Sequence, residues 1–257
     1  MAYNRLGALG AELRQYPVLI RKTVLDDPVS RRFAIAVFAA NALALGGYFL
    51  ARRAAGLQII EFPQWLSIER DGGALEILNY VQTGLAAAFL IATSLAARRP
   101  LYLAWGLLFL FTMLDDSLQY HESVGRMLVA GFHLPAAPGM RPQDTGELVA
   151  WAAAAAVLLP AVAFYHWKSP PDVRRHSIVL LFCFAALVMC AVVFDMIHMI
   201  LSRTPLAGAI GFLEDGGELI AMACACSYAF ALMLLHRRRR VAIRQSPDRY
   251  PQPARFG

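Results

Sequence analysis

Charged residues are scarce in this chain of 257 residues. They make up 16% of the sequence, against about 25% in a typical soluble domain. Hydrophobic residues make up 58%, and several runs approach or exceed about 18 mostly apolar residues, the length typical of a membrane-spanning helix. This composition excludes an ordinary soluble domain. It predicts an all-α protein, a polytopic membrane helix bundle embedded in a lipid bilayer.

Cysteine and lysine are sparse as well. All four cysteines lie inside apolar runs, where cysteine acts as a small core residue. Cys224 and Cys226 are two positions apart and face different ways on a helix, which argues against a shared metal or a disulfide. Lys22 and Lys168 are the only lysines among 24 basic residues. That bias suggests a GC-rich bacterial genome.

The net charge of +6 does not indicate nucleic-acid binding, because the basic residues flank the apolar runs as they do in membrane proteins. No cleavable signal peptide is evident. The first apolar run starts at Phe33, behind a long charged leader, so we expect it to remain as an anchor.

The pattern predicts three parts. Residues 1–32 form a basic cytoplasmic leader, either a short interfacial helix or a partly ordered tail. Residues 33–236 hold six transmembrane helices, and residues 237–257 form a basic, proline-containing cytoplasmic tail that is disordered from Ser246. The predicted spans are 33–51, 76–97, 101–120, 148–166, 177–200 and 208–235. The segment 121–147 has the Gly and Pro content of a loop.

The strongly basic segments all fall on one side of the membrane if the chain starts inside. The positive-inside rule then places both termini in the cytoplasm, and the bacterial inner membrane is the expected location. Arg52 and Arg53 are the exception, because they end the first span on the outer side. They either snorkel or pair with acidic residues there.

Acidic residues interrupt the apolar runs at one common depth. A count of about 20 residues per span, taken from the basic flanks, brings eight carboxylates and two histidines to the outer edge of the membrane. These residues are Glu76, Asp115, Asp116, His121, Glu122, Asp195, His198, Glu214, Asp215 and Glu218. Ionisable groups at this depth mark a functional site by default. Their mutual repulsion calls for a cation, shared protons or arginines to offset it.

We interpret this layer as a metal site. Spacings of three or four residues place its acids and histidines on one face of each helix, and carboxylates with imidazoles suit Zn, Fe or Mn. The expected metal ligands are Asp116, His121, Glu122, Asp195, His198, Glu214 and Glu218. Asp115 or Asp215 is the expected general base for a metal-bound water. Glu76, Asn79, Tyr80 and Thr83 form a polar stripe that could orient the ligands.

Simpler explanations exist for each part of the layer. The run from Asp115 to Glu122 could be a solvated helix end, and His198 could hydrogen-bond a core carboxylate. Glu214 and Asp215 could stabilise the start of a helix through its dipole. A set of nearby arginines could also turn the whole layer into a structural ion-pair network. These arginines are Arg52, Arg53, Arg70, Arg126 and Arg203.

The stretch Leu114-Asp115-Asp116, four residues, then His121-Glu122 resembles the signature of a family of uncharacterised bacterial polytopic membrane proteins. Those proteins usually read Leu-Asp-Glu, four residues and His-Glu, with an acid pair in the last span. This chain has Asp116 where the family has Glu, and the resemblance implies no activity. The set of acidic and histidine residues is also similar to that of the ceramidase and progestin-receptor superfamily of zinc hydrolases. Six predicted spans and two histidines at the right depth do not match that seven-helix fold, so its residues are not transferred.

Three functions fit these patterns. The first is a metal-dependent hydrolase, or a di-metal oxidoreductase, acting on an amphipathic or lipid substrate. The second is a cation or proton transporter. A transporter needs a polar path to the cytoplasm, whereas the inner halves of the third, fifth and sixth spans have no charged residues. The third is a non-catalytic subunit of a membrane complex.

Overall fold

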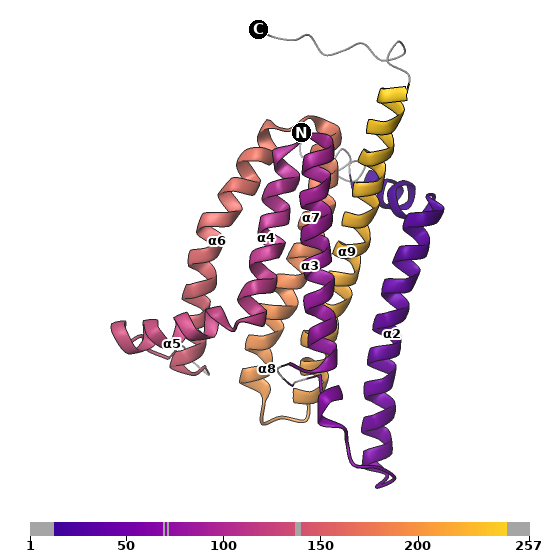
Figure 1. Cartoon of the computed structure of the whole chain (residues 1–257). Coiled ribbons are helices and arrows are strands. Elements are labelled where there is room, and N and C mark those ends of the chain that lie inside the picture. The colour runs from indigo at the N-terminus through magenta and orange to yellow at the C-terminus, as the bar shows by residue number, and fades with distance from the viewer. Residues whose placement is uncertain (1–12, 69, 71, 137–139, 246–257) are drawn as a thin grey trace, which may run out of the picture.

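The computed structural model describes residues 13–68, 70, 72–136 and 140–245, and over these residues all regular structure is helical. Residues 13–20 are helical and lead into the first short element (Figure 1). The elements are η1 (Arg21–Leu25), α2 (Pro28–Gly56), η2 (Gln64–Leu66), α3 (Ala74–Ala97), α4 (Pro100–Ser117), α5 (Tyr120–Phe132), α6 (Pro142–Lys168), α7 (Pro171–Val188), η3 (Met189–Phe194), α8 (Asp195–Leu201) and α9 (Ala207–Gln245).

Five helical stretches are long and apolar enough to cross a membrane, and a bent pair adds a sixth. The five are Pro28–Gly56, Ala74–Ala97, Pro142–Lys168, Pro171–Leu201 and Ala207–Ala242. The bent pair joins α4 and α5, whose axes differ by 69°. The described residues are therefore all-α, as predicted, and include five to six helical segments long and apolar enough to span a membrane, which is the pattern of an integral membrane protein.

Several predicted boundaries were wrong. The first span begins at Pro28, because the side chain of Asp27 caps that end by accepting a hydrogen bond from the Ser30 amide. The segment 121–147 is not a loop, since it holds α5 and the first turn of α6. Helix α9 continues past the predicted sixth span, 208–235, because the arginines that follow it extend the helix to Gln245. Residues 1–12 of the predicted leader and the tail from Ser246 lie outside the described residues.

The third predicted span, 101–120, breaks before its end. Helix α4 stops at Ser117, and Gln119 adopts a left-handed conformation with φ of 50°. A left-handed residue cannot continue a right-handed helix, so the chain turns here into α5. Asp115 and Glu122 therefore do not lie along one continuous helix.

Helices α3 and α9 form the centre of the bundle. Helix α3 packs against α4 and α9, and α9 also packs against α2 and α7. Helices α5 and α6 form a hairpin that joins the bundle through α4 (Figure 1). The hairpin is tight because two glycines cross: a Cβ on Gly146 would lie 2.4 Å from the Gly125 carbonyl oxygen.

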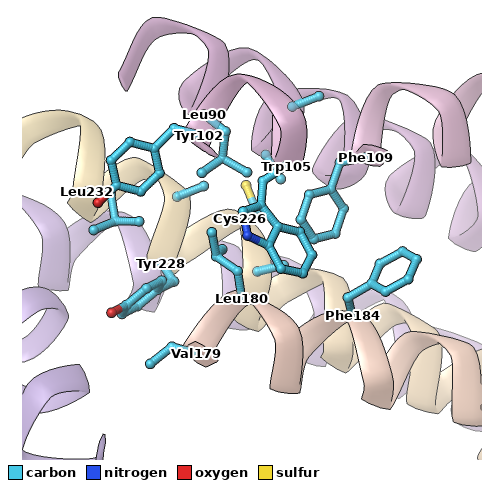
Figure 2. Packing of buried hydrophobic residues seen from close by; sticks show 14 of the residues in the cluster. Leu90, Tyr102, Trp105, Phe109, Val179, Leu180, Phe184, Cys226, Tyr228 and Leu232 are labelled. Atoms are coloured by element: carbon cyan, nitrogen blue, oxygen red, sulfur yellow. The ribbon is translucent and has the colours of Figure 1, made fainter. Parts of the chain in front are cut away.

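The middle of the bundle is a dense aromatic core. Trp105, Tyr102 and Phe109 of α4 pack with Leu180 and Phe184 of α7, as Figure 2 shows. Trp105 is 1% exposed, and its indole N–H donates to the Ser177 hydroxyl at 2.8 Å.

A buried amide pair joins α2 to α3 within the membrane. Asn41 Nδ2 donates to Gln82 Oε1 at 3.2 Å, and Gln82 Nε2 donates to Asn41 Oδ1 at 3.1 Å. Both side chains are buried. The two reciprocal hydrogen bonds satisfy side-chain amides that would otherwise lack partners inside the membrane.

The start of α2 and the end of α9 lie at the same end of the bundle, and α5 and α8 lie at the other (Figure 1). Arg238 of α9 pairs with Asp27 at this first end. At the far end, Arg52 does not need an acidic partner, because it donates to the Tyr48 hydroxyl at 3.0 Å and its guanidinium lies over the Tyr48 ring.

Candidate functional site

The end of the bundle that holds α5 and α8 contains a polar cavity of about 840 Å³. Side chains from α3, α4, α5, α6, α7, η3, α8 and α9 line it. All seven predicted metal ligands line this one cavity: Asp116, His121, Glu122, Asp195, His198, Glu214 and Glu218. Asp215 lines it too. The structure thus brings together residues that the sequence could only place at one depth.

Asp115 lies behind the cavity wall, where it orients His121. The two side chains meet at 3.0 Å between His121 Nδ1 and Asp115 Oδ2, and Asp115 is 3% exposed. In an unbroken helix, residues six apart are separated by about 9 Å along the axis and roughly 120° around it. The break at Gln119 is what allows this contact.

The ring of His121 is held on a second side by Trp151 of α6, with the ring centroids 5.7 Å apart. Because Asp115 occupies Nδ1, the ring nitrogen left for a cavity ligand is Nε2. The carboxylates of Asp116 and Glu147 also act on this imidazole electrostatically. His121 therefore sits fixed in a negative environment.

A second carboxylate–histidine pair forms between α8 and α9. His198 Nδ1 lies 2.8 Å from Glu214 Oε2, and both side chains are partly exposed to the cavity. The ring packs directly on α9 at Gly211, where an added Cβ would lie 2.9 Å from His198 Cε1. The sequence placed Asp195 beside His198 on one helix face, whereas the hydrogen bond goes to Glu214.

A π-helix sets the position of this second pair. Element η3 immediately precedes α8, and its wider turn changes the register of the residues that follow. It packs on α9 at Gly217, where a Cβ would lie only 2.5 Å from Cys190 Sγ. Asp195 and His198 therefore depend on a close contact that needs a glycine.

The polar stripe predicted on the second span supports Glu218. Asn79 Nδ2 donates to Glu218 Oε2 at 3.2 Å, and the Thr83 hydroxyl donates to the Asn79 carbonyl at 2.8 Å. Asn79 lines the cavity and is 7% exposed, and its Oδ1 has no hydrogen-bond partner. The Tyr80 hydroxyl donates to Glu76 in the same stripe.

Arginines lie on the exposed part of the cavity wall. Arg126 contacts Glu122 at 3.3 Å, and Arg141 contacts Asp144 at 2.7 Å. The side chains of these two arginines are 54% and 63% exposed, whereas Asp144 is buried. The bond to Asp144 raises the pKa of the Arg141 guanidinium, so this residue stays charged. The exposed wall therefore contains arginine–carboxylate ion pairs, which is part of what a structural ion-pair network predicts.

The sequence missed the contribution of α6. Arg141, Gln143, Glu147 and Trp151 line the cavity, although they were assigned to a loop or left unremarked. Gln143 Nε2 donates to Glu147 Oε1 at 2.7 Å. Pro142 followed by acids at Asp144 and Glu147 is a helix-start pattern that could have revealed this segment.

The donor set for a metal does not converge in this structure. Within the described part of the chain, no group of three or more His, Cys, Asp and Glu side chains comes together closely enough to hold a metal ion. Each histidine instead takes one carboxylate as its partner. Zn, Fe or Mn binding therefore stays a prediction, and so do the roles of Asp115 and Asp215 as general bases.

The charge of the cavity is strongly acidic. Eight carboxylates line it, against three arginines and two histidines. The remaining lining is apolar and comes largely from α7 and η3, including Phe184, Leu187, Val188, Ala191 and Val192. One wall of the cavity thus suits a hydrocarbon group and the rest suits a polar one.

Residues 31–232 match the model of a family described as a domain of unknown function, DUF8692. The chain belongs to this family. The matched range contains every residue that lines the cavity, so the cavity lies wholly within the DUF8692 domain. Neither the curated proteins nor the solved structures gave a match.

Proposed function

We propose that this protein is a membrane-embedded enzyme that performs general acid–base chemistry on an amphipathic or lipid substrate. The observation that supports the proposal is the presence of two carboxylate–histidine pairs, His121 with Asp115 and His198 with Glu214, beside one cavity of about 840 Å³. A cavity of this size accommodates a small polar group with part of an attached chain.

The chemistry follows from how each imidazole is held. A carboxylate that accepts the Nδ1–H fixes the ring and leaves Nε2 as the basic nitrogen. Nε2 can then take a proton from water or from a substrate hydroxyl, and the carboxylate stabilises the imidazolium that forms. One pair would act as the base and the other as the acid. A positioned acid or base contributes a rate factor of about 10² to 10⁴.

An amphipathic substrate is supported by the walls of the cavity. Helices α5 and α6 pack on each other and on α4, whereas α8 packs on α9 and η3. The cavity lies between these two groups of helices. A substrate with an apolar chain could therefore reach the polar residues from within the bilayer, along the apolar side chains of α7 and η3.

The cavity is proposed to face the outside, or the periplasm of a bacterial inner membrane. Support comes from the opposite end of the bundle, which carries the arginine-rich turn between α3 and α4 and the basic end of α9. Basic segments of this kind are retained in the cytoplasm.

Two of the three predicted functions, the transporter and the metal-dependent enzyme, make specific demands on the structure. A transporter would need a polar path through the bundle, and the buried aromatic core around Trp105 and Phe109 stands below the cavity instead. A metal-dependent enzyme would need the separate carboxylates and imidazoles to close around an ion.

The test is lipid conversion by the purified protein. The wild type, His121→Ala, His198→Ala and Gly211→Ala are reconstituted in vesicles of bacterial lipid extract, and lipid composition is followed by mass spectrometry. The His121 and His198 variants should lose at least about 100-fold in rate. Gly211→Ala should also lose rate, because its Cβ would displace the His198 ring from Glu214. His133→Asn is the matched control, since His133 is exposed and outside the cavity.

The acid–base proposal fails if no lipid changes, or if the histidine variants convert lipid as fast as the wild type. Elemental mass spectrometry on the same wild-type, His121→Ala and Glu218→Ala samples separates the metal-dependent version. A stoichiometric transition metal that both variants lose would establish that version. A channel would show instead as ion flux in the vesicles.

A further inference from the structure

An apolar groove of about 490 Å³ lies on the part of α9 against which α2 and α7 pack. Its lining comes from Leu45 of α2, from residues within 182–186 of α7 and from residues within 212–224 of α9. No charged residue is among the described residues that line it. Gly216 and Gly217 leave part of its floor on α9 without side chains. The groove shares no lining residue with the polar cavity.

The groove is built from helices that are apolar enough to cross a membrane. Its lining residues belong to the stretches Pro28–Gly56, Pro171–Leu201 and Ala207–Ala242. The hydrocarbon region of a bilayer holds no water, so an apolar groove at this depth is filled by hydrocarbon. Its volume lies within the range of ligand sites, about 300–1,000 Å³. The residues at its end then decide which headgroup the bound chain carries.

Helix α2 carries two arginines beyond the end of the groove. Arg52 follows Leu45 by seven residues, which is two turns or about 10 Å along the same helix face. Phe49 lies one turn before Arg53, and its ring meets that of Phe212 with 5.0 Å between the centroids. Phe212 lines the groove. The two arginines therefore stand one to two turns of α2 from the groove, on the side where α2 ends.

Both arginines can donate hydrogen bonds to an anionic headgroup. They are exposed, and among the described residues neither forms an ion pair with a carboxylate. Arg52 uses one N–H to bond the Tyr48 hydroxyl at 3.0 Å, and its guanidinium is held over the Tyr48 ring. A guanidinium has five N–H donors, so most of them stay available in a fixed position. Phosphate is an anion that guanidinium groups bind with two parallel hydrogen bonds.

We propose that the groove, together with Arg52 and Arg53, binds one anionic phospholipid of the phosphatidylglycerol type. One acyl chain lies in the groove between α2 and α7, and the headgroup phosphate accepts hydrogen bonds from the two guanidinium groups. Two positive charges without a carboxylate partner attract a headgroup of net negative charge and disfavour one that also carries an ammonium group. The site goes beyond the proposed acid–base function and does not depend on it.

The experiment is native mass spectrometry of the delipidated protein titrated in detergent with two lipids. The lipids are dioleoyl phosphatidylglycerol and dioleoyl phosphatidylcholine, which have the same chains and differ in the headgroup. The wild type should retain phosphatidylglycerol at least about 10-fold better, since one charge-assisted hydrogen bond commonly exceeds that factor. This comparison needs no variant, so misfolding does not affect it. Equal retention of the two lipids overturns the proposal.

Variants at the arginines test the headgroup contact. The double variant Arg52→Gln/Arg53→Gln should lose most of the preference for phosphatidylglycerol. Arg203→Gln is the matched control, because Arg203 is an exposed arginine in the turn between α8 and α9, at the same end of the bundle, and does not line the groove. An unchanged preference in the double variant, or an equal loss in Arg203→Gln, overturns the assignment of the phosphate to this pair.

A second pair of variants tests the acyl chain. Cys224→Phe adds a ring to the lining of the groove and should lower the retention of both lipids. Leu43→Phe should not, because Leu43 is 77% exposed on α2 and does not line the groove. Phosphatidylglycerol with a diazirine in its acyl chain, added to the wild type, should label the residues that line the groove. Labelling spread evenly over the exposed faces of the helices, or unchanged lipid retention in Cys224→Phe, overturns the proposal.

Discussion

A single methyl group at Gly217 should destabilise the packing that positions Asp195 and His198. Gly217 lies where α9 meets η3, and an added Cβ would lie 2.5 Å from Cys190 Sγ and 3.5 Å from Cys190 Cβ. Cys190 is 8% exposed, so its sulfur has little room to move aside. The clash is therefore with one identifiable atom.

Two opposing effects set the size of the change. Replacing glycine by alanine inside a helix stabilises it by about 0.5–1 kcal/mol. Overpacking a well-packed site costs about 1–3 kcal/mol. The expected net effect of Gly217→Ala is a destabilisation of about 1–2 kcal/mol. In a Cys190→Ala background only the 3.5 Å contact remains, so the same change should stabilise by about 0.5–1 kcal/mol.

The assay is the free energy of unfolding, measured by SDS titration in detergent micelles and followed by circular dichroism. The four proteins of the cycle are compared with Gly46→Ala, which has nothing within 4 Å of its added Cβ and should be stabilised. The coupling between positions 190 and 217 should be about 1–3 kcal/mol. A coupling below about 0.5 kcal/mol would refute the close contact between η3 and α9, since that is the size expected for independent sites.

Two further predictions concern the first helix. Asn41→Leu and Gln82→Leu should each cost about 1–3 kcal/mol in the same titration, because each strands the partner amide. The double variant should recover much of that loss, and strictly additive losses would contradict the pairing. Asp27→Ala should cost about 1 kcal/mol by removing a helix cap. The Ser30 amide lowers the pKa of Asp27, so this stabilisation is present above the ordinary pKa of about 4 and is lost as the pH falls through the lowered value. A wild-type advantage that persists unchanged in strong acid would contradict it.

The break between α4 and α5 could not be predicted from the sequence. Hydrophobicity alone predicted one span over residues 101–120, and nothing in the pattern requires Gln119 to adopt a positive φ. That conformation is costly for a residue other than glycine, and the surrounding packing must stabilise it. The crossing of Gly125 with Gly146 is part of that packing. The pairing of His121 with Asp115 depends on it.

The sequence by itself determined that this is an all-α membrane protein and that its acids and histidines lie at one level. Both follow from counting, because a helix rises about 1.5 Å per residue and a membrane has a fixed thickness. Tertiary structure alone decided which of these groups meet. Depth leaves the rotation of each helix open, and here that rotation was set by the left-handed Gln119, the π-helix η3 and the glycine contacts of α9. Those features separate the predicted ligands into two carboxylate–histidine pairs and leave Glu218 with Asn79.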